Sequence, residues 1–231
     1  MSRLARICCR DEVHRDDLLA AAVVGVVRAR GYERATVEDF AVWMGLSRDR
    51  FERRFAGKAD AVLEVLEGLL ASFRADVQAA FDRESRWPDN LRAAARAGDS
   101  WLRRNPDCAH FALVSVLEAP ELIRVRREET ILWGAALVDH GRQMAPDPDA
   151  VPLSAPLIAV GAMVETLRRA YEGSAEHQAI ASVPQLMYAA VRPYLGEEAA
   201  RRELEIADGA VEDSRLQPAY EAPTSRLPQP A

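Results

Sequence analysis

One short stretch of the sequence gathers side chains that could hydrogen-bond to the edges of nucleic-acid bases. Arg50 and Arg53 carry paired N–H donors that match the acceptors of guanine, and Asp49 and Glu52 carry carboxylates that can accept from cytosine. The alternative is a solvated helix with internal ion pairs, because Asp49 and Arg53 stand four residues apart in the favourable order. Base reading requires that a helix present these side chains on one outward face.

Contacts to backbone phosphates would come from residues around this stretch. Thr36 and Ser47 can each cap a helix whose first amides face an anion, and Arg48 and Lys58 supply positive charge. Lys58 is the only lysine in the chain, which otherwise uses arginine. We expect these four residues to complete the DNA-contacting set.

Three helices are predicted to position these side chains. The first covers residues 17–30 with Leu18, Leu19, Ala22, Val23, Val26 and Val27 on its inward stripe, and Gly31 fits a left-handed C-cap. The second begins after Thr36, with Asp39 completing a capping box, and ends at Gly45. The third begins after Ser47 and turns Phe51 and Phe55 inward, one turn apart. Two short helices joined by a tight glycine turn predict a helix-turn-helix.

These residues together resemble the N-terminal signature of the tetracycline-repressor (TetR) family of transcription regulators. The resemblance covers about residues 16–65 and rests on Gly31-Tyr32, Thr36-Val37, Phe40-Ala41, Gly45-Leu46-Ser47, Phe51, Phe55 and Lys58. It implies an all-α fold in which a three-helix DNA-binding unit precedes a helical ligand-binding and dimerisation domain. The chain departs from the family at Glu52, where a tyrosine is common, and at Asp49, where a small residue is usual.

The remainder of the chain also reads as helices. The expected domains are residues 1–58, 59–207 and a disordered tail at 208–231, because the tail is rich in proline and poor in apolar residues. We expect Pro193 to kink or end the last strong helix, and the charged residues 197–207 are helix-prone. The expected helices cover 59–81, 90–104, 106–118, 120–143, 155–172 and 182–195, with a proline-rich loop at 144–154.

The resemblance places a small-molecule effector and a homodimer interface in this second domain. The run from Leu157 to Val164 is apolar on every side of its helix, so it needs both its own domain and a second subunit as partners. In the family the last two strong helices, here 155–172 and 182–195, form the dimer interface. The large apolar residues that could line an effector pocket, or else form plain core, are Phe73, Trp101, Phe111, Trp133, Met163 and Tyr171.

Composition narrows the function further. The first sixty residues hold 12 basic and 10 acidic residues, whereas the remainder holds 18 basic and 26 acidic residues. Only the segment where DNA contact is expected therefore has a net positive charge. No apolar stretch is long enough for a signal peptide or a membrane span, which favours a cytoplasmic protein. Cys108 and His110 point to different sides of a helix, and no metal-ligand spacing or cofactor loop is found, which argues against an enzyme.

The sequence therefore predicts a ligand-responsive DNA-binding regulator without cofactor or metal. We expect a repressor that binds a pseudo-palindromic double-stranded operator as a dimer and is released by a small apolar or amphipathic effector. An activator is also compatible with these residues. The rival hypothesis, motivated by the acids Asp49 and Glu52, is a helical small-molecule sensor or interaction module whose helix-turn-helix no longer binds DNA.

Overall fold

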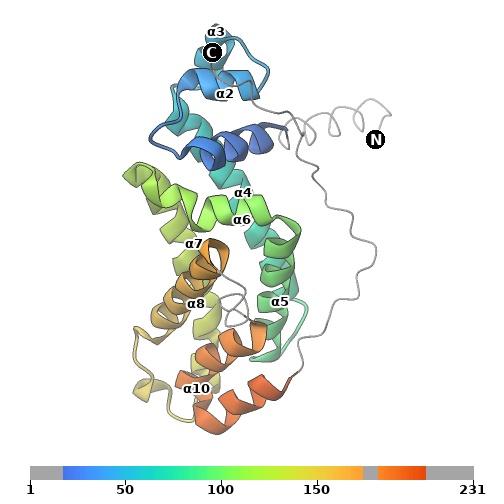
Figure 1. The fold of residues 1–231 in the computed structure, drawn as a ribbon. Helices are drawn as coiled ribbons and strands as arrows, with labels where there is room; N and C mark the ends of the chain where they lie inside the picture. The colour runs from blue at the N-terminus through green and yellow to red at the C-terminus, as the bar shows by residue number, and fades with distance from the viewer. Residues whose placement is uncertain (1–17, 174–181, 207–231) are drawn as a thin grey trace, which may run out of the picture.

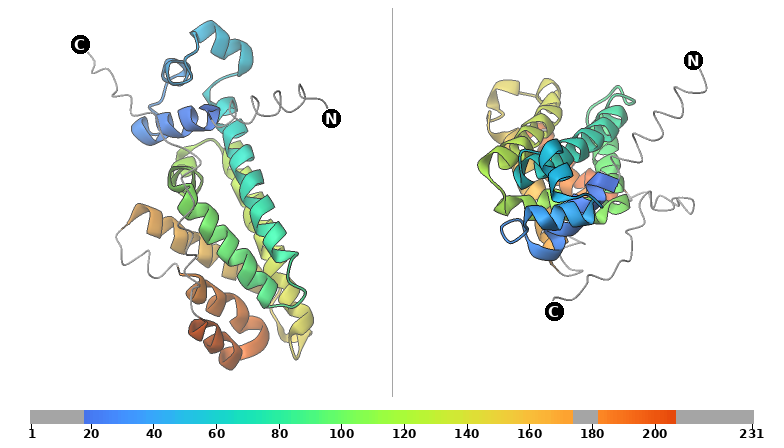
Figure 2. Two further views of the ribbon diagram at one scale, coloured as in Figure 1. Left: turned by 90° about the vertical axis from the view of Figure 1, so that its right-hand side faces the viewer. Right: turned by 90° about the horizontal axis from the view of Figure 1, so that it is seen from above.

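The computed structural model describes residues 18–173 and 182–206, and within these ranges the chain is helical and has no strand. An elongated molecule results, with three short helices at one end and a bundle of longer helices below them (Figure 1). Helix α4 leaves the short helices and runs along the bundle (Figure 2). The all-α prediction is confirmed, while the tail expected at 208–231 lies outside the described residues.

The three N-terminal helices form where the sequence places them. The first described helix covers residues 18–30 and ends at Gly31, whose φ of 75° is readily reached only by glycine. Helix α2 (Val37–Trp43) and helix α3 (Arg48–Arg54) are separated by a turn in which Gly45 has a φ of 64°. One expectation was wrong, because Leu18 does not face inward and is 53% exposed.

A capping box starts α2. The Asp39 side chain accepts from the Thr36 backbone N–H at 2.9 Å, and the Asp39 N–H donates to the Thr36 hydroxyl oxygen at 3.3 Å. Two amides that the helix cannot satisfy internally are thereby paired, which fixes the start of the helix next to α3.

We expect Thr36→Ala to lower the free energy of unfolding by about 1 kcal/mol, because the Asp39 N–H loses its side-chain acceptor. Thr36→Ser should keep most of the stability, since serine caps equally well. Thr166→Ala is the matched control: that exposed hydroxyl donates to the Ala162 carbonyl within α8, and its loss should cost little. Urea unfolding followed by circular dichroism measures all three. Equal losses for Thr36→Ser and Thr36→Ala would show that the cap contributes nothing.

Helices α4 (Lys58–Phe81) and α5 (Asp89–Arg104) pack along each other and form one side of the bundle. Both lie within one residue of the predicted ranges. The inward stripe of α4 carries Val62, Leu66 and Leu70 near its start and Val77 near its end. The same helix therefore supplies core residues to both ends of the molecule.

The two helices predicted over 106–118 and 120–143 are each interrupted. Helix α6 (Pro106–Leu113) gives way at Val114 to the 3-10 helix η1 (Ser115–Glu118), and α7 (Glu121–Asp139) tightens into η2 (His140–Met144). At the first break the Ser115 hydroxyl lies 3.2 Å from His110 Nδ1, and Val116 is 1% exposed. The regular helix therefore ends where Val116 is buried and Ser115 contacts His110. Neither contact can be predicted from the periodicity of the sequence.

The last helices agree with the prediction except for the position of the kink. Helix α8 (Ala155–Glu172) has the predicted bounds, and the loop before it contains the short 3-10 helix η3 (Pro148–Ala150). Helix α10 (Val183–Glu205) is two helices that meet at Gly196, where φ is 80°. Pro193 remains inside the first of the two, so the break expected there lies three residues later. Glycine is the residue that reaches this backbone conformation without steric cost.

The buried apolar side chains form four clusters. The first fills the space between the three N-terminal helices and the start of α4, and it continues into Phe111 of α6, Val116 of η1 and Ile123 of α7. The core of the N-terminal unit therefore does not stop at residue 58, where the domain boundary was expected. The other three clusters lie among α4, α5, α6, α7, α8 and α10.

Candidate nucleic-acid interface

Two phenylalanines anchor the inner face of α3. Phe51 is fully buried and Phe55 is 2% exposed, and their ring centroids lie 5.0 Å apart. Phe40 of α2 packs against Phe51 with ring centroids 6.3 Å apart. Because these rings fix which side of α3 faces the core, the opposite side is held outward, as the sequence predicted.

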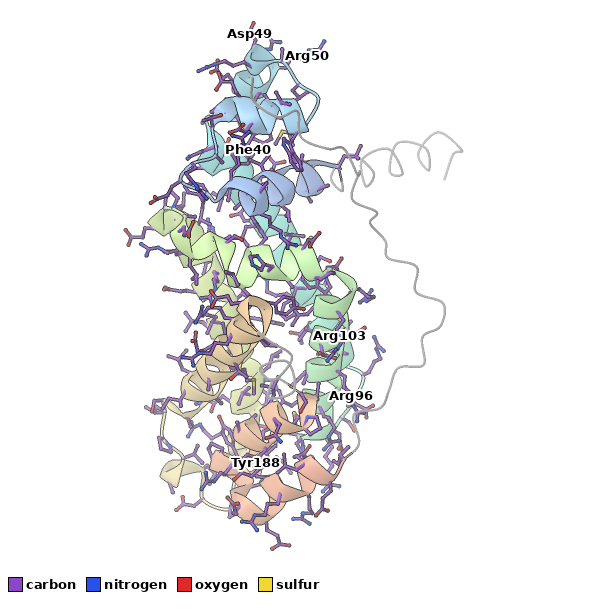
Figure 3. All side chains as sticks on the ribbon, viewed as in Figure 1. Phe40, Asp49, Arg50, Arg96, Arg103 and Tyr188 are labelled. Atoms are coloured by element: carbon purple, nitrogen blue, oxygen red, sulfur yellow. The ribbon has the colours of Figure 1, made fainter. Side chains whose placement is uncertain are left out.

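The outward side of α3 presents the proposed base-reading residues. Asp49, Arg50, Glu52 and Arg53 are all exposed. Asp49 and Arg50 lie at the extreme tip of the molecule and point away from it (Figure 3). Within the described part of the chain, the side chains of Asp49, Arg50 and Arg53 make no hydrogen bond or ion pair. Their donors and acceptors are therefore available to a partner outside the chain.

Ion pairs around α3 differ from the expected one. Asp49 and Arg53 do not pair; instead Arg48 Nε donates to Glu52 Oε1 at 2.7 Å, and the Arg48 guanidinium also pairs with Glu38 of α2. The hydrogen bond with Glu52 and the charges of both carboxylates raise the pKa of Arg48. Arg48 thus neutralises Glu52, which leaves Asp49 as the one unpaired acid at the tip among the described residues.

The two capping side chains are engaged within the chain. The Thr36 oxygen accepts from Asp39 N–H, and the Ser47 hydroxyl accepts from Arg50 N–H at 3.4 Å. Hydrogen bonds to Thr36 lower the pKa of Asp39, assisted by Arg30 and opposed by burial. Both caps are exposed, so their role is to orient α2 and α3, and a phosphate contact from either remains a prediction.

Lys58 holds the N-terminal unit together. Its ammonium nitrogen lies 2.8, 3.0 and 2.9 Å from the carbonyl oxygens of Tyr32, Glu33 and Ala35. It also lies 4.6 Å from the centroid of the Tyr32 ring. All three N–H donors of the ammonium are therefore committed to the turn after the first helix. This geometry supports a positioning role for Lys58, and its phosphate contact remains a prediction.

Comparison with known proteins identifies the fold. No protein-family model and no curated protein matches the sequence. Several solved structures do match. One is the fatty acid degradation regulator FadR from Bacillus halodurans, with a TM-score of 0.61 and 14% identity over 75% of this chain and 97% of that one. Another is a protein assigned as a transcriptional regulator from Pseudomonas aeruginosa PAO1, with a TM-score of 0.61 and 19% identity over 84% of this chain and 91% of that one. A third is assigned to the TetR family, from Shewanella sp. PV-4, with a TM-score of 0.58 and 13% identity over 78% of this chain and 96% of that one. The chain has the TetR-type fold.

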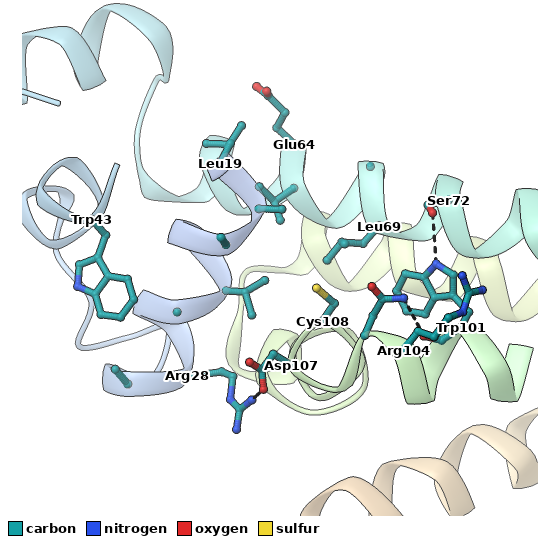
Figure 4. A pocket seen from close by; sticks show the side chains of 18 of the residues that line it. Leu19, Arg28, Trp43, Glu64, Leu69, Ser72, Trp101, Arg104, Asp107 and Cys108 are labelled. Carbon is teal, nitrogen blue, oxygen red and sulfur yellow. Dashed lines mark hydrogen bonds and ion pairs between the residues drawn. The ribbon is translucent and has the colours of Figure 1, made fainter. Parts of the chain in front are cut away.

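A groove lies where the N-terminal unit of this TetR-type fold meets the bundle. It has a volume of about 1130 Å³ and lies between the first helix, α4, the end of α5 and the start of α6, with Trp43 at one end and Trp101 at the other (Figure 4). An ion pair between Arg28 of the first helix and Asp107 of α6 crosses from one unit to the other. Sequence reasoning missed this groove. The sequence feature that marks the groove is Gly68 in the middle of α4, which leaves the groove open at that point. A Cβ added to Gly68 would meet no atom within 4 Å.

The six residues predicted to line an effector pocket are distributed among several clusters. Phe111 is fully buried in the first cluster, beside the N-terminal unit, and so belongs to plain core. Phe73 and Trp101 meet edge to face with centroids 5.5 Å apart, and Tyr171 packs against the same cluster. Trp133 lies at the edge of a second cluster with Phe73, and Met163 at the edge of a third. Only Trp101 lines the groove.

Two histidines outside the N-terminal unit contact neighbouring side chains. His110 contacts Ser115, and burial lowers the pKa of His110. The ring of His140 packs against Phe81 at 5.1 Å. Among the described residues, no group of three or more histidine, cysteine or acidic side chains could hold a metal ion, and no helix has both the length and the hydropathy to cross a membrane.

Proposed function

We propose that the protein is a DNA-binding transcription regulator that reads base edges with α3. The observation that carries this proposal is the tip of α3, where Arg50 and Arg53 are exposed and free of carboxylate partners while Phe51 and Phe55 hold the helix in place. Helix α3 is then the recognition helix, and its N-terminal residues enter the major groove. Arg50 and Arg53 contact guanine, and Asp49 accepts from cytosine.

The protein acts as a homodimer through α8 and α10 in this proposal. Supporting it, the apolar run of α8 is only half covered by its own chain: Leu157 is 46% and Ile158 is 66% exposed, whereas Ala159 and Val160 are buried. At Gly161 an added Cβ would meet nothing within 4 Å, so a second helix can approach closely there. Two-fold symmetry would place two α3 helices about one DNA turn apart on a pseudo-palindromic operator.

A small effector bound in the bundle releases the DNA, which makes the protein a repressor. Helix α4 has 24 residues, about 36 Å at 1.5 Å per residue, and contributes core to both ends of the molecule. A ligand that prefers a dimer with the wrong spacing of α3 helices would oppose DNA binding. The coupling free energy of such systems is about 1 to 3 kcal/mol.

Selection of duplexes from a random library by the purified full-length chain tests this function. We expect an inverted repeat to be enriched, and we expect the affinity for the winner to fall with salt as phosphate contacts are screened. No enrichment at low salt, with and without the carboxylate probes named below, would favour the sensor whose helix-turn-helix does not bind DNA. The unpaired Asp49 at the tip is the observation that keeps that rival open.

On the selected operator, we expect Arg50→Ala to weaken binding about 5- to 150-fold, because one bidentate guanine contact is worth about 1 to 3 kcal/mol. The loss should shrink when the contacted base pair is changed, which a uniform phosphate contact would not produce. Arg202→Ala is the matched control, since this exposed arginine lies on α10 at the far end of the molecule. Fluorescence anisotropy measures both. Unchanged affinity for Arg50→Ala removes Arg50 from the reading set.

A further inference from the structure

The interior of the bundle is divided rather than continuous. Its buried side chains fall into three separate clusters, and large apolar residues at their edges are only partly buried. This seam of partly exposed residues runs between α4, α7 and α8, and its members are Phe73, Ile131, Trp133, Met163, Val164, Leu167 and Tyr171. These partly exposed side chains on α4, α7 and α8 offer apolar surface on which the hydrocarbon part of a ligand can pack.

Helix α7 turns two polar side chains toward this interior. Arg127 comes one helical turn after Ile123, which is 1% exposed, and Thr130 and Gly134 continue the same stripe. Gly134 lies against Val160 of α8, which shows that the stripe faces the bundle. The Thr130 hydroxyl oxygen is buried, and within the described ranges it has no hydrogen-bond partner.

Arg127 carries a guanidinium for which the described residues provide no close anion. Among the described residues it has no hydrogen bond and no carboxylate within ion-pair distance, although it is partly buried. The nearest acid on α8, Glu165, is already paired with Arg168 and Arg169, and Glu172 is paired with Arg168. Burial lowers the pKa of Arg127, and Arg168 lowers it further, while Glu128 and Glu165 oppose them. A partly buried guanidinium without a close anion is costly for the free protein.

We infer that Arg127 and Thr130 bind the carboxylate of an apolar acid, whose hydrocarbon body fills the seam between α4, α7 and α8. Arg127 donates paired hydrogen bonds to the carboxylate, and the Thr130 hydroxyl donates a third. The surrounding Phe73, Trp133 and Leu167 match an aromatic ring or alkyl chain. Only the role of the acid as the effector rests on the proposed function, whereas its binding at Arg127 and Thr130 does not.

Binding is tested without DNA, so its result is independent of whether the protein reads an operator. Isothermal titration with 2-naphthoate and decanoate is compared with their uncharged counterparts, 2-naphthamide and 1-decanol. The variants are Arg127→Met, Arg127→Lys and Thr130→Val. Arg124→Met is the matched control, because Arg124 is an exposed arginine on the same helix. Thermal unfolding of each unliganded variant is measured in parallel.

At least one carboxylate should bind wild type and Arg124→Met more tightly than its uncharged counterpart does. Arg127→Met should bind it about 30-fold or more weakly, and Arg127→Lys should recover part of that loss. Unliganded Arg127→Met should melt about 2 to 4 °C higher than wild type, because an unpaired buried charge is gone. A lower melting temperature for Arg127→Met with unchanged carboxylate binding would make Arg127 a structural residue and overturn the site. Failure of both carboxylates to bind wild type at millimolar concentration would overturn it as well.

Discussion

Glu203→Ala is expected to lower the free energy of unfolding by about 3 kcal/mol or more. Glu203 is 4% exposed and accepts two hydrogen bonds from the Arg92 guanidinium, at 2.9 and 2.8 Å, across the contact between α5 and α10. Removal of Glu203 leaves the Arg92 guanidinium buried without its main anion, and this unpaired buried charge destabilises the folded state. Asp89 also pairs with Arg92, but its side chain is 47% exposed and compensates only in part.

Urea unfolding followed by circular dichroism measures this loss. Glu205→Ala on the same helix is the control, since Glu205 is exposed and its removal should change stability by less than about 0.5 kcal/mol. Glu203→Gln should fall between the two, because an amide oxygen still accepts one hydrogen bond. If Glu203→Ala lowers the free energy of unfolding no more than Glu205→Ala does, the Arg92 guanidinium reaches solvent in the variant and the buried ion pair does not stabilise the fold.

Lys58→Met is expected to cost about 2 to 3 kcal/mol of stability, because three backbone carbonyls lose a charged donor at once. Lys58→Arg should not restore it: a planar guanidinium cannot direct donors to three carbonyls that converge on one nitrogen. Arg86→Met, which removes an exposed positive charge just beyond α4, is the control.

The same variants separate the two roles considered for Lys58. A positioning role lowers the melting temperature and impairs DNA binding only because the helix-turn-helix loosens, so DNA affinity should recover on cooling. A direct phosphate contact would leave the melting temperature unchanged and reduce the salt dependence of DNA binding by about one contact. Melting curves and a salt titration of operator affinity, both on the full-length chain, decide between these outcomes.

Local signals account for the parts of the fold that the sequence predicted well. Gly31, Gly45 and the box formed by Thr36 and Asp39 each act within four residues, so their consequences can be read along the chain. The inward spacing of Phe51 and Phe55 determined in the same way which face of α3 is free. The proposed reading residues Asp49, Arg50 and Arg53 follow from that face alone.

The remaining features depend on contacts between distant segments. Arg48 pairs with Glu38, ten residues away, and the carbonyls that Lys58 reaches lie more than twenty residues before it. The stripe that carries Arg127 looks like an ordinary charged helix until the burial of α7 is known. Proline and glycine can each interrupt a helix, so the sequence alone does not decide between Pro193 and Gly196. The break lies at Gly196, where φ is 80°, a value that glycine reaches and proline cannot.

The continuity of the first buried cluster limits how freely this protein's helix-turn-helix unit can be exchanged. Phe111, Val116 and Ile123, all beyond residue 105, complete the packing around residues from the first helix and α2. A hybrid joined at residue 58 to another regulator's effector domain would meet that packing with side chains of different shape, leaving voids or clashes beneath the helix-turn-helix. Under the proposed function, altered operator specificity is therefore better engineered by changing side chains on the outer face of α3 than by transplanting the whole unit.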